Sequence, residues 1–134
     1  MELEVHEIQE DDSYRTYGLA LFASSETGLR GFEFQRNLRA PGDPNAPRPP
    51  FDAYCVVNES HDVSFGGVEF VSWGEKVLVL RFSEEAAEEL SLPSREVSLV
   101  LAVSDGDLDV VKRGILDVFS YGPPDRLPAM LGFS

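Results

Sequence analysis

Alternation of apolar and polar residues between Phe51 and Phe82 constrains the fold more than any other feature of the sequence. The stretch reads FDAYCVVNESHDVSFGGVEFVSWGEKVLVLRF and holds the only cysteine, the only tryptophan and a pair of adjacent glycines. Side chains of a β-strand alternate between two faces, so such runs with short polar connections predict three consecutive strands. The chain is therefore expected to be built on a β-sheet.

The glycine pair falls where the alternation changes phase. Val63 and Phe65 share one parity, whereas Val68 and Phe70 have the other. An unbroken strand would send half of these side chains to solvent, so we expect a β-bulge or sharp bend at Gly66-Gly67. A phosphate-binding role for the pair would need a helix directly after it, and the following residues predict a strand.

The rest of the chain adds further strands and two helices. Strands are predicted over 2–8, 17–23, 29–36, 51–58, 63–71, 76–82 and 96–103, with 9–13 as a charged turn and 73–75 as a hairpin turn. Ser83 is expected to cap a short helix, and a second helix is predicted from about Asp107 to Ser120. These elements predict an α+β fold: a mainly antiparallel curved sheet of about six or seven strands with one or two helices packed against it.

Two segments are predicted to lack regular structure. Residues 37–50 carry five prolines in the last ten positions, and we expect either a mobile excursion or a binding loop. Residues 121–134 hold apolar side chains without helical length, which predicts a non-regular tail. A chain of 134 residues is long enough to bury one core, so 1–134 is expected to be a single domain.

Charge and residue usage narrow the classes of function. The net charge of −13 disfavours binding to nucleic acid or an anionic membrane and favours basic partners. One cysteine and two histidines are too few ligands for a structural zinc, and neither metal nor cofactor is expected. The segment MELEVHEIQEDD has no basic region and no apolar run of signal length, so a cytoplasmic protein is expected.

Groups that would support catalysis are sparse. Cys55 lies in an apolar strand and His61 in the turn after it, which favours a buried small side chain and a surface histidine over a catalytic pair. The paired carboxylates of the first helix are Glu84, Glu85, Glu88 and Glu89. They lack an apolar pocket that would separate their titrations, so an enzyme is not expected.

Acidic residues are unevenly spread along the chain. Six of the first twelve residues are acidic, the first predicted helix adds four, and Asp105, Asp107 and Asp109 add three. Arginines gather instead before Phe51, at Arg30, Arg36, Arg39 and Arg48. Solubility alone would explain a negative total; the alternative is recognition of a basic partner by an acidic surface.

Four short motifs occur in a fixed order between about Leu29 and Val103. They are Phe34-Gln35-Arg36, Tyr54-Cys55-Val56, Phe65-Gly66-Gly67-Val68, and a hydrophobic strand that runs into a helix at Glu84 to Leu90. In this order the motifs resemble the immunity protein 10 family of bacterial polymorphic toxin systems. The resemblance implies a non-enzymatic cytoplasmic antitoxin that binds a cognate toxin domain, often a nuclease, and blocks it.

The resemblance and the charge pattern together give candidate residues. We expect toxin contact through Glu84, Glu85, Glu88 and Glu89, through Asp105, Asp107 and Asp109, or through the amino-terminal strand. The motif residues Phe34, Gln35, Arg36, Tyr54, Cys55, Phe65, Gly66 and Gly67 are interpreted as core and turn positions.

Two other classes and the oligomeric state stay open. A small-molecule-binding barrel would show a large internal apolar pocket. An acidic secretion-type chaperone would be a dimer with exposed apolar grooves. The chain itself is expected to be either a monomer or a homodimer.

Overall fold

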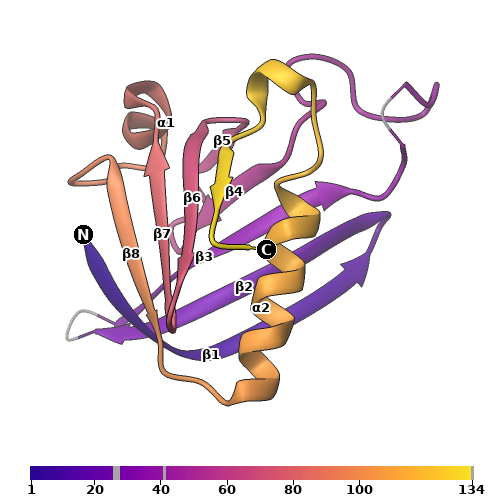
Figure 1. The fold of residues 1–134 in the computed structure, drawn as a ribbon. Helices are drawn as coiled ribbons and strands as arrows, with labels where there is room; N and C mark the ends of the chain where they lie inside the picture. The colour runs from indigo at the N-terminus through magenta and orange to yellow at the C-terminus, as the bar shows by residue number, and fades with distance from the viewer. Residues whose placement is uncertain (26–27, 41, 134) are drawn as a thin grey trace.

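The computed structural model describes residues 1–25, 28–40 and 42–133, which form one sheet of nine strands and two α-helices (Figure 1). The strands are β1 (Glu2–Ser13), β2 (Thr16–Ser25), β3 (Gly28–Asn37), β4 (Cys55–Asn58), β5 (Val63–Phe65), β6 (Val68–Gly74), β7 (Val77–Phe82), β8 (Glu96–Leu101) and β9 (Ala129–Leu131). The helices are α1 (Glu84–Glu89) and α2 (Asp105–Val118), with a 3-10 turn η1 (Pro124–Arg126). The α+β class is confirmed.

The sheet is assembled from two antiparallel units. Strands β1 to β5 follow one another as a meander, and β6 to β8 form the second unit. A parallel pairing of β1 with β8 joins them, with Glu2 opposite Ser98 and Val5 opposite Leu101. Strand β9 adds to the far edge, parallel to β6. The sheet is therefore mixed but mostly antiparallel.

Both helices pack on the same side of this sheet. Figure 1 shows β1 to β3 crossing behind α2 while β6 to β8 run in a different direction, so the sheet curves round the helix. Val111, Ile115 and Val118 of α2 are fully buried against it, and α2 contacts β2 and β3 directly. Helix α1 buries Ala86 and Ala87 near β5 and β7. The removal of these apolar side chains from water is the main force that holds the layers together.

A serine N-cap precedes each helix, Ser83 before α1 as expected and Ser104 before α2. Ser83 Oγ accepts a hydrogen bond from the Ala86 amide at 3.1 Å, and Ser104 Oγ accepts one from the Asp107 amide at 3.1 Å. These bonds satisfy backbone donors that the first turn of a helix leaves free. Helix α2 consequently starts at Asp105, slightly earlier than expected, and ends at Val118.

The bend expected at Gly66-Gly67 is confirmed, but the single strand expected over 63–71 is wrong, because the bend separates two strands, β5 and β6. Gly66 has a φ of +66°, β5 ends just before the pair, and β6 starts just after it. Strand β5 is at one edge of the sheet, whereas β6 lies beside the other edge. Because two residues connect them, the sheet must curl until its two ends are close together.

The charged turn expected at 9–13 is wrong. These residues continue β1 to Ser13, and the turn is made by Tyr14 and Arg15, both with positive φ. Two-residue turns with positive φ match the twist of the flanking strands, which allows the long hairpin. The polar side chains are tolerated because they point to solvent or, at Glu10, accept a hydrogen bond from Tyr17.

Two other boundaries also differ from expectation. The strand expected from Phe51 starts only at Cys55, because the Tyr54 amide donates to the Tyr121 carbonyl at 3.0 Å instead of joining a ladder. The hairpin turn expected at 73–75 lies at Glu75 and Lys76, since Gly74 still pairs with Val77.

The non-regular tail expected at 121–134 is also wrong, because the segment contains η1 and β9. Arg126 holds it in place: its guanidinium donates to the Pro50 carbonyl at 2.7 Å and to the Phe65 carbonyl. These contacts with residues far away in the sequence position β9 beside β6. A strand of three residues has no pattern of its own in the sequence that would predict this pairing. In the proline-rich loop, residues 38–40 and 42–50 have no helix or strand, as expected; Pro41 and the terminal Ser134 lie outside the described residues.

Candidate functional site

The three acidic segments of the sequence lie in three different places. Helix α1 follows β7 at one end of the sheet, and α2 starts at the opposite end because β8 runs between them (Figure 1). Strand β8 has six residues, which at ~3.3 Å per residue separates the two helix groups by roughly 20 Å. The candidate residues on α1 and α2 therefore do not form one surface.

The α1 carboxylates project from a short helix into solvent. They are Glu84, Glu85, Glu88 and Glu89, and all four are exposed. Glu84 and Glu85 occupy the first turn, where the helix dipole favours negative charge, and Glu89 accepts a hydrogen bond from Ser64 Oγ at 2.9 Å. None of the four pairs with a lysine or arginine that the structure describes.

The α2 carboxylates stand in and just after the first turn of that helix. Asp105 and Asp109 are exposed, and Asp107 is half-buried beside the cap at Ser104. Their position complements the helix dipole, so stabilisation of α2 explains them without a partner.

Strand β1 divides its carboxylates between the two faces of the sheet. Glu10 is on the helix side, where it accepts a hydrogen bond from Tyr17 Oη at 2.5 Å. Burial, together with this bond, raises the pKa of Tyr17. The carboxylates that alternate onto the opposite side are Glu2, Glu4, Glu7 and Asp11, given that Leu3, Val5 and Ile8 pack with the core. We call that helix-free side the uncovered face.

Five arginines of the described chain are already paired with its own carboxylates. Arg36 lies 2.8 Å from Asp117 and its guanidinium stacks over the Tyr121 ring at 4.9 Å. Arg30 lies 2.8 Å from Glu59. The remaining pairs are Arg81 and Arg95 with Glu69 and Arg126 with Asp52. Much of the positive charge is thus compensated locally, whereas the carboxylates of β1, of α1 and of the start of α2 have no lysine or arginine partner among the described residues.

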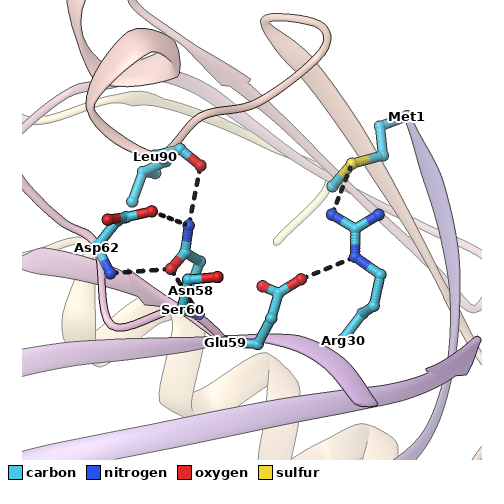
Figure 2. Close-up of polar contacts among 7 residues, drawn as sticks. All are labelled: Met1, Arg30, Asn58, Glu59, Ser60, Asp62 and Leu90. Carbon is cyan, nitrogen blue, oxygen red and sulfur yellow. Dashed lines mark hydrogen bonds and ion pairs between the residues drawn. The ribbon is translucent and has the colours of Figure 1, made fainter. Parts of the chain in front are cut away.

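A polar turn closes the end of β4 and fixes its surroundings (Figure 2). Asn58 Oδ1 accepts hydrogen bonds from the amides of Ser60 and Asp62, and Asn58 Nδ2 donates to the Leu90 carbonyl at 2.9 Å. Glu59 in the same turn is held by Arg30. The turn is therefore tied both to the end of α1 and to β3.

Cys55 and His61 are not arranged for catalysis. Burial raises the pKa of the Cys55 thiol to about 12, and its Sγ donates to Gln35 Oε1 at 3.4 Å. His61 is exposed in the turn after β4 and lines a different hollow from the thiol. A protonated thiol facing an amide is no nucleophile. Within the described residues, no group of three or more histidine, cysteine or acidic side chains could hold a metal.

The motif residues are divided between the core and the uncovered face. Phe34 and Tyr54 are fully buried, and each packs against the ring of Phe119. Tyr54 Oη accepts a hydrogen bond from the Val68 amide at 3.0 Å, which ties β4 to the strand after the glycine bend. Gln35 and Cys55 contact each other on the uncovered face, and Phe65 lies against the ring of Phe51 at 5.0 Å.

The uncovered face was not anticipated as a site. The sequence of 17–23 is apolar on both faces and predicts a central or covered strand; β2 is central, between β1 and β3, but no helix covers its second face. Ala20 and Phe22 of β2 and Val57 of β4 have the parity opposite to the core residues of their strands. Apolar residues that alternate with the core residues in neighbouring strands are the signal in the sequence that could have revealed this face.

No helix of the described chain is long and apolar enough to cross a membrane. The family model for immunity protein 10 matches residues 2–109, a longer stretch than the motifs alone covered. No curated protein matches the chain. Immunity proteins neutralise a toxin by binding it, without catalysis of their own. The chain therefore belongs to the immunity protein 10 family, as a non-enzymatic protein whose partner is a cognate toxin.

Proposed function

We propose that this chain neutralises a basic nuclease toxin in the cytoplasm by placing an acidic surface over the toxin's phosphate-binding cleft. The observation that carries the proposal is the uncompensated negative charge. The net charge is −13, and the exposed carboxylates of α1 and of the uncovered face lack lysine or arginine partners among the described residues.

A nuclease must be basic where it grips phosphates, so its cleft and this chain attract each other. Attraction of this kind raises association rates by ~10 to 1,000-fold and penalises partners of the wrong charge. A small-molecule-binding barrel fits less well, because Val111, Ile115 and Val118 of α2 fill the interior that such a barrel would keep open.

The test uses the toxin domain encoded beside this chain, produced as a catalytically dead variant. Its association rate with the chain is measured by stopped flow at about 50 and about 500 mM salt, where the screening length falls severalfold. We expect the association rate to fall at least tenfold at high salt. Binding that is tight and independent of salt would contradict an acidic inhibitor surface.

Two variants with equal charge changes compare the candidate surfaces. One converts Glu84, Glu85, Glu88 and Glu89 to glutamine, and the other converts Glu2, Glu4 and Glu7 to glutamine and Asp11 to asparagine. Each set removes the same number of exposed carboxylates. Both variants should therefore lose the same amount of long-range electrostatic attraction to the toxin. The set that directly contacts the toxin should additionally raise the dissociation rate.

A further inference from the structure

The uncovered face is unusually apolar for the solvated side of an antiparallel sheet. Such a side normally carries polar residues, in alternation with the apolar residues that face the core. Here β2 contributes Gly18, Ala20 and Phe22, β4 contributes Cys55 and Val57, and β5 contributes Val63 and Phe65. Gly18, Ala20 and Cys55 are buried by their neighbours, Phe22, Val57 and Phe65 are half-buried, and Val63 is exposed. An apolar surface that no helix of the described residues covers points to a partner.

Part of this surface is covered by the chain itself. Phe51, Ala53 and Pro47 line a hollow with Cys55 and Phe65, and the rings of Phe51 and Phe65 meet edge to face. The other part, around Phe22 and Val57, stays open. It forms a hollow of about 360 Å³ lined by Ala20, Phe22, Gly31, Phe32, Glu33, Val57, Asn58, Glu59 and His61.

The base of the hollow is shaped by Gly31, which lies opposite Phe22 in the ladder. A Cβ at this glycine would lie 2.5 Å from the Leu21 carbonyl oxygen and 3.2 Å from the Phe22 ring. The absence of a side chain lets the Phe22 ring lie close over the β3 backbone, as an apolar wall of the hollow.

Two carboxylates line the hollow, those of Glu33 and Glu59, and Glu59 is paired with Arg30. Glu33 is half-buried, receives a hydrogen bond from the Gln35 amide group, and pairs with no lysine or arginine that the structure describes. On β1, which β2 separates from β3, Glu7 lies opposite Phe22 and Asp11 lies opposite Gly18. The basic groups at the rim are His61, which is exposed, and Arg30, which Glu59 already holds.

We propose that this hollow receives an arginine or lysine side chain from a basic loop of the toxin. The aliphatic part of that side chain lies against Phe22 and Val57, and its cationic head reaches Glu33. Long basic side chains bind in this way because the stem is apolar and the head is charged. The proposal rests on the proposed function, since it supplies the contact by which a basic toxin is held.

The other acidic groups do not offer such an anchor. The hollow beside α1, lined by Glu85, Glu89 and Gly67 among others, already contains the chain's own Arg126 guanidinium. The α2 carboxylates are accounted for by the helix dipole. Anchors in interfaces are typically buried in a pocket with apolar walls. The hollow on the uncovered face combines such walls with the carboxylate of Glu33, which has no lysine or arginine partner among the described residues.

The test compares Glu33→Gln with Glu85→Gln, two substitutions that change the net charge equally. Affinity for the catalytically dead toxin domain is measured by calorimetric titration, and thermal unfolding of each free variant checks its fold. We expect Glu33→Gln to weaken binding at least tenfold and Glu85→Gln to weaken it less than threefold. Val57→Lys, which puts a competing ammonium in the hollow, should weaken binding more than a hundredfold.

Hydrogen exchange of the complex gives a second measurement that does not depend on any variant. Protection should appear at residues 18–22, 31–35 and 55–59 and not at 84–89 or 105–109. Tight, salt-dependent binding with protection on α1 or α2 would contradict the proposal that the hollow binds a basic side chain, but not the proposal that an acidic surface inhibits the toxin. Absence of binding to the toxin domain would overturn both.

Discussion

Tyr54 and Cys55 are neighbours in the chain, yet they face opposite sides of the sheet. Tyr54 lies in the core, and Cys55 lies under Phe51 and Pro47 on the uncovered face. Burial raises the pKa of the tyrosine from 10.0 and that of the thiol from 9.0, each to about 12. The shared cause is loss of water around the charged form.

These two groups predict a loss of stability in alkaline solution. The pKa values of both groups are higher in the folded chain than in the unfolded chain. Their contribution to the free energy of unfolding is therefore complete below pH 9 and is lost as the pH rises from 9 to 12. Urea unfolding from pH 8 to 11 measures this, and Cys55→Ala should reduce the slope between pH 9 and 10. An equal decline in both proteins would show that the thiol is not protected. Alkylation by iodoacetamide at pH 8 should be slow in the native chain and fast in urea.

Gly67 is required for the packing of α1, for reasons of space alone. A Cβ at this position would collide with the Ala86 side chain and lie 2.9 Å from Ser64 Oγ. We expect Gly67→Ala to lower the free energy of unfolding by about 1–3 kcal/mol. Gly74→Ala is the matched control: its new methyl group would meet only the Val77 carbonyl, at 3.8 Å, so the change should stay within about 0.5 kcal/mol. If both substitutions lowered the free energy of urea unfolding equally, lack of space for a side chain would not explain the glycine at position 67.

At the scale of the element, the sequence predicted most strands, both helices and the glycine bend, because each has a local signal. The caps at Ser83 and Ser104 and the alternation in β3 and β7 are of this kind. Strand β9 and the last part of β1 were not predicted, because distant contacts decide them: Arg126 with Pro50 and Phe65, and Tyr17 with Glu10.

The turn at the end of β4 should stabilise α1 from outside the helix. Asn58→Ala removes the hydrogen bonds to the Leu90 carbonyl and to the turn amides, which predicts a loss of about 1–3 kcal/mol and faster exchange of the amides at 84–90. Asn45→Ala makes the same chemical change in the proline-rich loop, where the side chain is exposed, and should have little effect on unfolding. Unchanged exchange in α1 would mean that the helix does not depend on the turn.

At the scale of the whole molecule, the acidic segments of the sequence indicated the sign of the partner but not the surface. Thirteen carboxylates occur in three segments, and the topology sends these segments to separate places, with β8 between α1 and the start of α2. Glu33 belongs to none of the segments, and only the strand register brings it to the same face as the β1 carboxylates, with β2 between them. A site made of residues from several strands cannot be recognised by counting charges along the sequence.

The excess negative charge should destabilise the folded chain, although it favours binding to a basic toxin. A net charge of −13 repels itself in the compact state, so raising sodium chloride from roughly 20 to 500 mM should increase the melting temperature. The expected rise is on the order of 2–4 °C for each kcal/mol of repulsion screened. The glutamine variant of the α1 carboxylates should show a smaller rise. A melting temperature that falls with salt would mean that the internal ion pairs outweigh the repulsion.

The parallel pairing of β1 with β8 imposes an order on how the protein is made. As the chain leaves the ribosome, β1 to β5 can pair with one another, while the other edge of β1 stays unpaired until β8 has been made. An open strand edge invites pairing with other nascent chains, and charged side chains discourage it. Glu2 and Glu4 sit on that waiting edge. We therefore expect carboxylates in this part of β1 also to discourage aggregation of the newly made chain, and the complete sheet can form only after β8 has emerged.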